Sequence, residues 1–219
     1  LRNYLKIIAP VVGSRTAFGG GYFKSLLDTT SYSVATAAVS VLVGSLAAYS
    51  FARIRFPRKR FVLGLTMVLQ TTPGLAVAIP LYIMLQATGL FDTIPGLTLI
   101  LSAFYAPVTA WIMISFFKAI PQELIESGLL DGCTRLRAFF AIVFPLAAPG
   151  LAAAFLWMFL SVWGEFMMPL LFTSTRVSPV TVVVSRSVGS FWQDYGLTMA
   201  ESILCMIPPM TLALLFQKY

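Results

Sequence analysis

Charged residues divide this chain into long uncharged stretches separated by short polar segments. No Asp, Glu, Lys or Arg occurs in residues 29–52, 61–91, 93–117, 138–164 or 202–217. A helix that crosses a membrane needs roughly 20 consecutive apolar residues. The pattern therefore predicts an all-α fold, a polytopic membrane helix bundle within one transmembrane domain, residues 1–219. The five predicted spans are residues 31–52, 62–85, 94–117, 149–172 and 197–217.

The composition agrees with this class and excludes several others. Of the 219 residues, 58% are hydrophobic and only 11% are charged, whereas soluble domains carry about 25% charged residues. The chain has no histidine, which excludes histidine-dependent catalytic triads and histidine-ligated metal sites. Two cysteines, Cys133 and Cys205, are too few for a four-thiolate site. We expect no catalytic residue, no metal site and no directly bound cofactor.

The basic residues predict which loops face the cytoplasm. Residues 53–60 contain five Arg and Lys side chains, whereas residues 88–95 contain none. Because cytoplasmic loops are enriched in Lys and Arg, the first loop is predicted inside and the second outside. Alternation places residues 118–140 inside and 173–196 outside. The net charge of +7 has this topological explanation, so no nucleic-acid partner is expected.

The same topology places the N-terminal segment, residues 1–28, outside the membrane. This segment has no signal peptide, because its apolar runs are short and interrupted by glycine and charge. We therefore expect a further span upstream and six spans in the natural protein.

Two features inside the predicted spans concern helix geometry. Prolines, including Pro73 and Pro107, remove a backbone donor and favour breaks or bends, as expected where helices line a pathway. Ser40, Gly44 and Ala48 recur every four residues on one face, which permits close packing of helices. Packing within this chain is the preferred interpretation of that face over contact with another subunit.

Polar and aromatic side chains within the spans suggest a pathway for a neutral polar solute. Sugars are bound by hydrogen bonds together with aromatic stacking, and these residue types supply both. Interfacial belts and packing between helices are the alternative role for such aromatics. The candidate pathway-lining residues are Gln70, Thr71, Tyr82, Tyr105, Trp163 and Glu165.

Two acidic residues, Glu165 and Glu201, lie within predicted spans. A carboxylate inside a membrane is a functional candidate by default, and an ion- or proton-coupled secondary carrier that uses both is the alternative function. Both positions are predicted near the outer surface, however, and no Lys, Arg or His is available within the spans for a relay. A structural role near the external end is therefore favoured, and an intramembrane enzyme is excluded on the same grounds.

The segment 120–145 has the local features of two short helices joined by a turn. Pro121 suits a helix start, Gly132 can end the first helix, and Thr134 can cap the second. The first half is acidic and the second half is basic. A lipid-binding amphipathic segment would carry a basic face throughout, so we expect this cytoplasmic loop to contact a protein.

The spacing of residues in this loop resembles a known motif. The matching residues are Glu126-Ser127-Gly128, then after three residues Gly132, then after nine residues Ile142, and after one more residue Phe144-Pro145. In this spacing the loop is similar to the EAA loop. That loop marks the permease subunits of ABC importers, which drive uptake with ATP. Ser127 and Gly128 replace the usual alanines, and the glycine should loosen the first helix by roughly 1 kcal/mol relative to alanine.

Further stretches resemble the maltose-permease-like sugar branch, in its smaller permease type. They are residues 48–57, Trp163-Gly164-Glu165-Phe166, and residues 195–200 with Pro208 and 216–219. The resemblance implies a cytoplasmic (inner) membrane protein of a bacterium or archaeon. It also implies a second homologous permease, two ATPase subunits that hold ATP and Mg, an external solute-binding protein, and a small polar solute, namely a sugar. The chain has no GxxxxGK[ST] motif, so it is not expected to bind ATP or to be an enzyme.

The resemblance also assigns roles to individual residues. The ATPase-coupling set is Glu123, Glu126, Ser127, Gly128, Asp131, Gly132, Arg135, Phe139 and Pro145. The external loop 173–196 is expected to reach the binding protein through Ser185, Arg186, Ser187 and Gly189.

Overall fold

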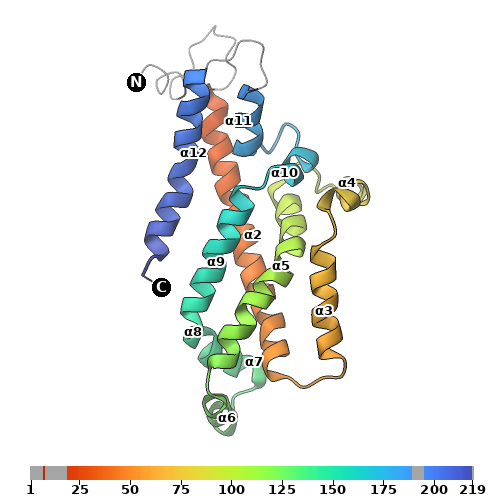
Figure 1. The fold of residues 1–219 in the computed structure, drawn as a ribbon, viewed down its shortest axis with the longest axis vertical. Helices are drawn as coiled ribbons and strands as arrows, with labels where there is room; N and C mark the ends of the chain where they lie inside the picture. The colour runs from red at the N-terminus through yellow and green to blue at the C-terminus, as the bar shows by residue number, and fades with distance from the viewer. Residues whose placement is uncertain (1–6, 8–18, 189–194, 219) are drawn as a thin grey trace. The chain divides into compact units, whose positions relative to one another are not determined.

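Every regular element in the described part of the chain is a helix. The computed structural model describes Ile7 and residues 19–188 and 195–218, and its element order confirms the all-α prediction (Figure 1). The chain forms two compact units. The first comprises residues 1–36, 74–101 and 159–215, and the second comprises residues 37–73, 102–158 and 216–219. The assignment of residues 1–219 to one transmembrane domain stays a prediction.

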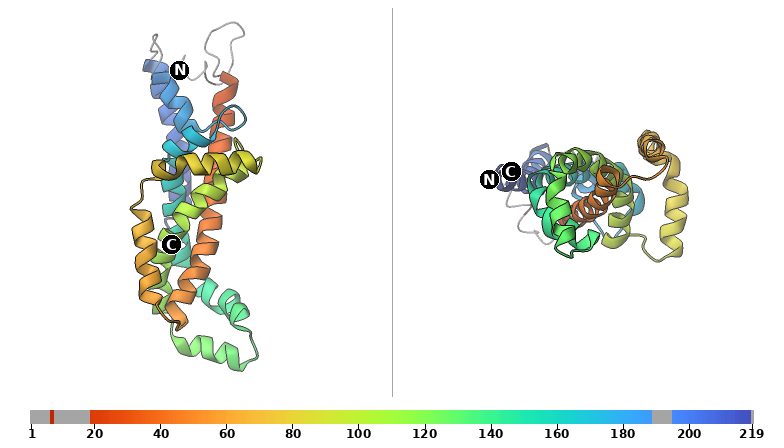
Figure 2. Two further views of the ribbon diagram at one scale, coloured as in Figure 1. Left: turned by 90° about the vertical axis from the view of Figure 1, so that its right-hand side faces the viewer. Right: turned by 90° about the horizontal axis from the view of Figure 1, so that it is seen from below.

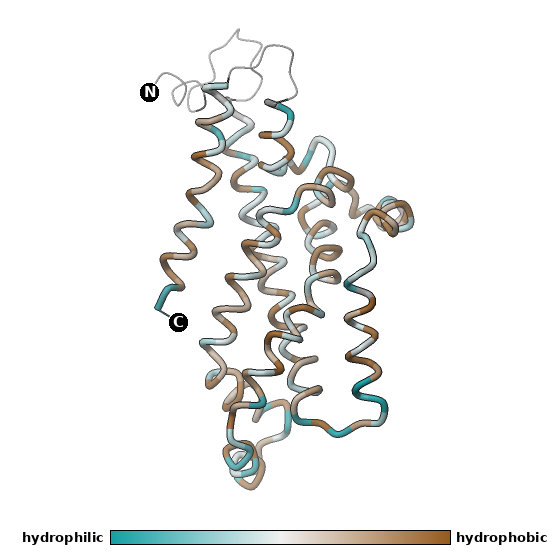
Figure 3. The backbone as a smooth tube through the Cα atoms, in the orientation of Figure 1, coloured by the Kyte–Doolittle hydropathy of each residue, from teal (hydrophilic) through white to brown (hydrophobic). Residues whose placement is uncertain are grey.

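Among the described residues, three helices are long and apolar enough to cross a membrane. They belong to α2 (Gly19–Arg53), α5 (Ile94–Ala119) and α12 (Tyr195–Phe216), and Figure 3 shows apolar residues along them. The bounds of α5 and α12 agree closely with the predicted spans. Helix α2 begins twelve residues before its predicted start at 31. Lys24 and Asp28, which limited that prediction, form an ion pair of 2.9 Å within the helix.

The second and fourth predicted spans differ from single uninterrupted helices. Residues 62–85 divide into α3 (Lys59–Gln70), a short 3-10 turn at Gly74–Val77 and α4 (Ala78–Ala87). Pro73 explains this break, because it lacks an N–H and disfavours helical backbone at the residue before it. Residues 149–172 divide into α9 (Ala148–Trp163) and α10 (Met167–Phe172).

Short helices form the segment between α5 and α9 in the second unit. They are α6 (Gln122–Leu130), α7 (Arg135–Ala138), a wide helical turn at Phe139–Val143 and α8 (Phe144–Leu146). Figure 2 shows α6 running crosswise to α5 beyond its C-terminal end. The segment Arg135–Leu146 meets Ala148–Trp163 at a bend of 80°, and Pro145 and Pro149 lie on either side of this bend.

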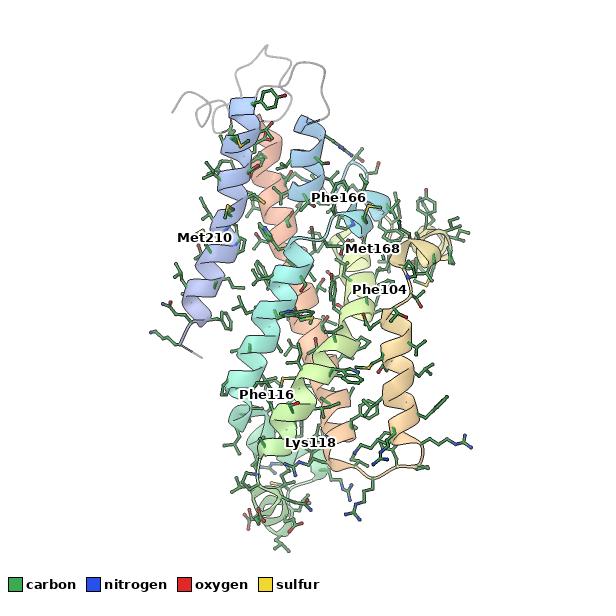
Figure 4. The ribbon with its side chains drawn as sticks, viewed as in Figure 1. Phe104, Phe116, Lys118, Phe166, Met168 and Met210 are labelled. Carbon is green, nitrogen blue, oxygen red and sulfur yellow. The ribbon has the colours of Figure 1, made fainter. Side chains whose placement is uncertain are left out.

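Two glycines allow the helices of the second unit to approach closely. A methyl group added at Gly44 of α2 would lie 2.7 Å from the Thr109 side chain and 2.9 Å from the Ala106 carbonyl oxygen of α5. The face that carries Gly44 therefore packs within this chain, as the preferred interpretation stated. A methyl group at Gly150 of α9 would lie 2.4 Å from the ring of Phe116 (labelled in Figure 4).

Candidate functional site

Helix α6 ends in a two-bond turn that requires Gly132. The N–H of Cys133 donates to the Gly128 carbonyl at 3.0 Å, and the N–H of Gly132 donates to the Leu129 carbonyl at 3.1 Å. This pair of bonds is the Schellman cap, whose central residue adopts left-handed backbone. Gly132 has φ +85°, a conformation that glycine adopts at little cost. The sequence prediction that Gly132 ends the first helix is confirmed.

The second helix begins with the predicted cap. The Thr134 hydroxyl accepts a hydrogen bond from the Arg137 N–H at 3.3 Å, which satisfies one of the unpaired donors at the start of α7. Phe139 follows and is 1% exposed. Its ring lies 4.9 Å from that of Tyr49 and 5.9 Å from that of Phe117. The loop is thus anchored to α2 and α5 by one buried aromatic side chain.

The exposed face of α6 carries the acidic side chains. Glu123 and Glu126 of α6 are exposed, as is Asp131 directly after it. Glu126 accepts a hydrogen bond from Gln122 at 2.8 Å. The Ser127 hydroxyl donates to the Leu124 carbonyl within the same helix. Arg135 and Pro145 are also exposed. These charged groups are accessible to a protein partner.

Gly128 has a packing role that the sequence did not indicate. It is buried, and a methyl group there would lie 2.4 Å from Cδ1 of Ile142. The glycine therefore lets α6 approach the second half of the loop. The sequence analysis expected Gly128 only to weaken α6. The close packing against Ile142 that Gly128 permits offsets that loss of helix stability.

Arg53 at the end of α2 fastens this helix to the start of the loop. Its guanidinium donates to the carbonyl of Phe117 at 2.6 Å and also to the carbonyl of Ile120. Phe117 lies in the last turn of α5 and Ile120 directly follows that helix, where a cation is favourable. A cavity of about 250 Å³ adjoins this anchor. It is lined by Tyr49, Arg53, Ile54, Gln122, Ile125, Glu126, Leu129 and Arg135. The sequence placed Arg53 in a basic run and in the family-like stretch 48–57, but it did not indicate these contacts.

Three candidate pathway residues, Gln70, Thr71 and Tyr105, belong to the second unit. Gln70 donates to the Phe104 carbonyl of α5, and the Thr71 hydroxyl donates to the Val68 carbonyl at 2.8 Å. Nearby, Trp111 donates to the Thr66 hydroxyl at 3.2 Å.

A cavity of about 350 Å³ lies between α2, α3 and α5, and its lining is almost wholly apolar. That lining suits hydrocarbon better than a sugar. It is formed by Val43, Gly44, Ala47, Phe51, Leu63, Thr66, Ala103, Ala106, Pro107, Ala110 and Trp111.

The other candidates, Tyr82, Trp163 and Glu165, belong to the first unit. Tyr82 is exposed, accepts a hydrogen bond from Gln86 and meets the Phe91 ring edge-on. Trp163 is 6% exposed and stacks on Phe159. These contacts lie within the first unit, and the pathway role of the six candidates stays a prediction.

The acids Glu165 and Glu201 occupy distinct settings in the first unit. The Glu165 carboxylate accepts the N–H groups of Met167 and Met168 at 3.1 and 3.4 Å, so it caps the start of α10. Figure 4 labels Met168 on this short helix. Glu201 is 1% exposed, and its backbone carbonyl accepts a hydrogen bond from the hydroxyl of Tyr22.

The expected binding-protein residues lie at the end of α11 (Val180–Val188). The Ser185 hydroxyl donates to the Val182 carbonyl at 2.8 Å, and Arg186 is exposed. Ser187 is also in α11, and Gly189 lies outside the described residues. The segment before α11 is held by Asp92, which the sequence analysis missed. The available signal was that Asp92 is the single charged residue between positions 61 and 117.

The fold is that of a polytopic membrane helix bundle with a charged helical loop. Within the described residues, no group of three His, Cys, Asp or Glu side chains could hold a metal ion. Residues 40–219 match the family "Binding-protein-dependent transport system inner membrane component". The chain belongs to this family, as an ABC importer permease of the sugar branch.

Individual relatives agree with this assignment, and a solved structure has the same fold. The "Trehalose transport system permease protein SugB" of Mycobacterium tuberculosis is 33% identical over 208 residues, which cover 93% of this chain and 76% of that protein. The "Trehalose/maltose transport system permease protein MalG" of Thermococcus litoralis is 32% identical, covering 100% of this chain and 77% of that protein. A solved bacterial ABC transporter "involved in the import of the acidic polysaccharide alginate" has a TM-score of 0.78 and 19% identity, over 99% of this chain and 78% of that chain. This structural likeness concerns the fold.

Proposed function

We propose that this chain forms, with a second permease, the membrane pathway of an ATP-driven importer and couples to a separate ATPase through residues 120–145. The observation that carries the proposal is the architecture of that loop. Its acidic face on α6 is exposed, while Gly132, Thr134 and Phe139 fix its shape through backbone and buried contacts. A loop held rigidly while presenting charge is suited to transmit movement between two proteins.

The proposed orientation follows the distribution of basic residues. Residues 53–60 and the loop lie on the cytoplasmic side, where the ATPase subunits with their ATP and Mg are placed. Helix α11 lies on the external side, where a solute-binding protein delivers the solute. Rapid labelling by an impermeant thiol reagent of a cysteine placed at Arg58 or Arg137, in intact cells, would contradict this orientation.

The proposed solute is a sugar. This rests on relatives of this chain that are named as permeases for trehalose, for trehalose and maltose, and for diacetylchitobiose. Uptake of radiolabelled trehalose, maltose and diacetylchitobiose by cells with and without this chain tests the class. Uptake that stops on ATP depletion but survives collapse of ion gradients supports an ABC importer over a secondary carrier.

The secondary-carrier alternative has less support, because the Glu165 carboxylate is engaged as a helix cap. An ion carrier needs carboxylates that exchange protons or cations during transport. Loss of the two bonds from Met167 and Met168 in each cycle would uncap α10.

The decisive experiment is Glu126→Ala, with Gln122→Ala as its matched control. If Glu126 pairs with a basic group on the ATPase, truncation at the interface costs about 2–5 kcal/mol. The control removes the hydrogen-bond donor of Glu126 but keeps its charge. We expect normal membrane abundance of both variants, and loss of ATPase co-purification and of uptake only for Glu126→Ala. Full retention of the complex and of uptake in Glu126→Ala would contradict the proposed coupling.

A further inference from the structure

The carboxylate of Asp92 accepts four consecutive backbone N–H groups. Asp92 lies in the connection between α4 and α5 and is 6% exposed. Its Oδ1 accepts from Ser174 at 2.9 Å and from Val177 at 3.1 Å. Its Oδ2 accepts from Thr175 and Arg176, both at 2.8 Å. In return, the Asp92 N–H donates to the carbonyl of Phe172, so the two segments are bonded in both directions.

Helix α2 holds the next residues of the same segment. The Asp28 carboxylate accepts the N–H of Ser178 at 3.0 Å, and the Thr29 hydroxyl accepts the N–H of Val180 at 2.9 Å. Lys24 donates to the carbonyl of Arg176. Residues 174–180 therefore have their backbone donors satisfied by side chains from two other parts of the first unit. The segment leads directly into α11.

Charge is essential to the Asp92 contact. Burial alone raises the pKa of a carboxyl group, but the four N–H donors outweigh it and lower the pKa of Asp92 below its usual value. Each carboxylate oxygen faces two backbone donors. An asparagine of the same shape would place its NH₂ group against two of them, leaving those donors unsatisfied.

We propose that Asp92 is a positioning residue that pre-orders residues 174–180 and so presents α11 to the external solute-binding protein. This inference rests on the proposed function. Without the bonds to Asp92, residues 174–180 would have to be ordered each time the binding protein associates. The entropy lost in that ordering would weaken the association. The Asp92 bonds therefore raise the affinity for the binding protein and leave the rate of the ATP-driven step in the bound complex unchanged.

The test compares Asp92→Asn with Asp28→Asn and the control Thr88→Val in the assembled transporter in proteoliposomes. Among the described residues, the Thr88 hydroxyl bonds to the carbonyls of Met84 and Leu85 in the preceding helix, α4. The probe is the binding protein that supports wild-type uptake of trehalose, maltose or diacetylchitobiose, titrated with that sugar. The readouts are the half-saturating binding-protein concentration, the maximal stimulated ATP hydrolysis, and hydrogen exchange at Ser174–Val177.

Asp92→Asn should raise the half-saturating concentration by roughly tenfold, the equivalent of ordering about one residue again on binding. It should speed exchange at residues 174–177 and leave the maximal rate unchanged. Asp28→Asn keeps an amide oxygen that can accept the Ser178 N–H, but it loses the charge that pairs with Lys24. It should therefore show a smaller rise, and Thr88→Val none.

An unchanged half-saturating concentration in Asp92→Asn would overturn the inference, as would a fall in the maximal rate alone. If Asp92→Asn fails to assemble, Asp28→Asn decides by the same criterion. Absence of stimulation in the wild-type complex would instead contradict the proposed function itself.

Discussion

Replacement of Gly132 should disturb coupling through backbone conformation and not through crowding. At φ +85° a residue with a Cβ is strained, yet a methyl group built there has no neighbour within 4 Å. Left-handed backbone costs about 1–2 kcal/mol for an ordinary residue. Asparagine tolerates it better, whereas a β-branched residue tolerates it least. We therefore expect increasing damage in the order Gly132→Asn, Gly132→Ala, Gly132→Val.

The expected loss of ATPase affinity follows from the two hydrogen bonds of the helix cap. Escape from the strain requires the turn to change, which breaks the bonds that Gly132 and Cys133 donate to α6. If the penalty of about 1–2 kcal/mol is expressed fully as loss of the docking-competent loop, Gly132→Ala lowers apparent ATPase affinity roughly 5- to 30-fold. Titration of the ATPase subunit against purified permease complex, read as co-purification, measures this change.

Gly89 provides a matched control. It has φ +69°, open space around its Cβ position, and the same pair of cap bonds, from Gly89 to Gln86 and from Leu90 to Leu85. Gly89→Ala should thus carry a similar conformational penalty without affecting ATPase affinity. The reasoning fails if damage at position 132 follows side-chain size, with Asn worse than Ala, or if Gly89→Ala lowers ATPase affinity equally.

Four further outcomes are expected. Phe139→Ala should destabilise the loop by about 3–5 kcal/mol, seen as a lower melting temperature of the complex, whereas Phe139→Leu should lose less. Gly150→Ala should be destabilising because of the Phe116 ring, and Phe116→Leu in the same chain should recover part of the loss. Thr134→Ala should cost about 1 kcal/mol, measurable by denaturant titration of the complex. The pKa of Asp92 is lowered in the folded state, so its bonds should contribute their full stabilisation of the folded state above the ordinary aspartate pKa of about 3.9. Protection of residues 174–177 should therefore stay constant from pH 8 to 5 and be lost only as the pH falls through the lowered pKa.

Local signals in the sequence were sufficient for the loop. Gly132 and Thr134 act within a few residues of themselves, so helix capping alone located the end of α6 and the start of α7. The uncharged stretches likewise gave α5 and α12 closely. The start of α2 was missed because Lys24 and Asp28 neutralise each other one helical turn apart, an arrangement that a search for charge-free stretches excludes.

Contacts between distant segments could not be predicted in the same way. Asp92 bonds to residues more than eighty positions away, and its partners are backbone N–H groups that every residue except proline carries. The sequence of the partner segment therefore contains no signal. The interruption at residues 164–166 was missed for a related reason, since the Glu165 side chain serves as a cap only in the broken helix.

The anchor at Arg53 has a consequence for how this loop can change. Arg53 bonds to the carbonyl oxygens of Phe117 and Ile120, and a carbonyl is present whatever side chain stands at those positions. The Arg53 bonds therefore do not constrain the exposed side chains of α6. Those side chains can be substituted without breaking the contact between the loop and α2. A loop with a different acidic face could be transplanted onto this chain and still be held in place. Under the proposed coupling, adaptation to a new ATPase would then require changes on the exposed face of α6 alone.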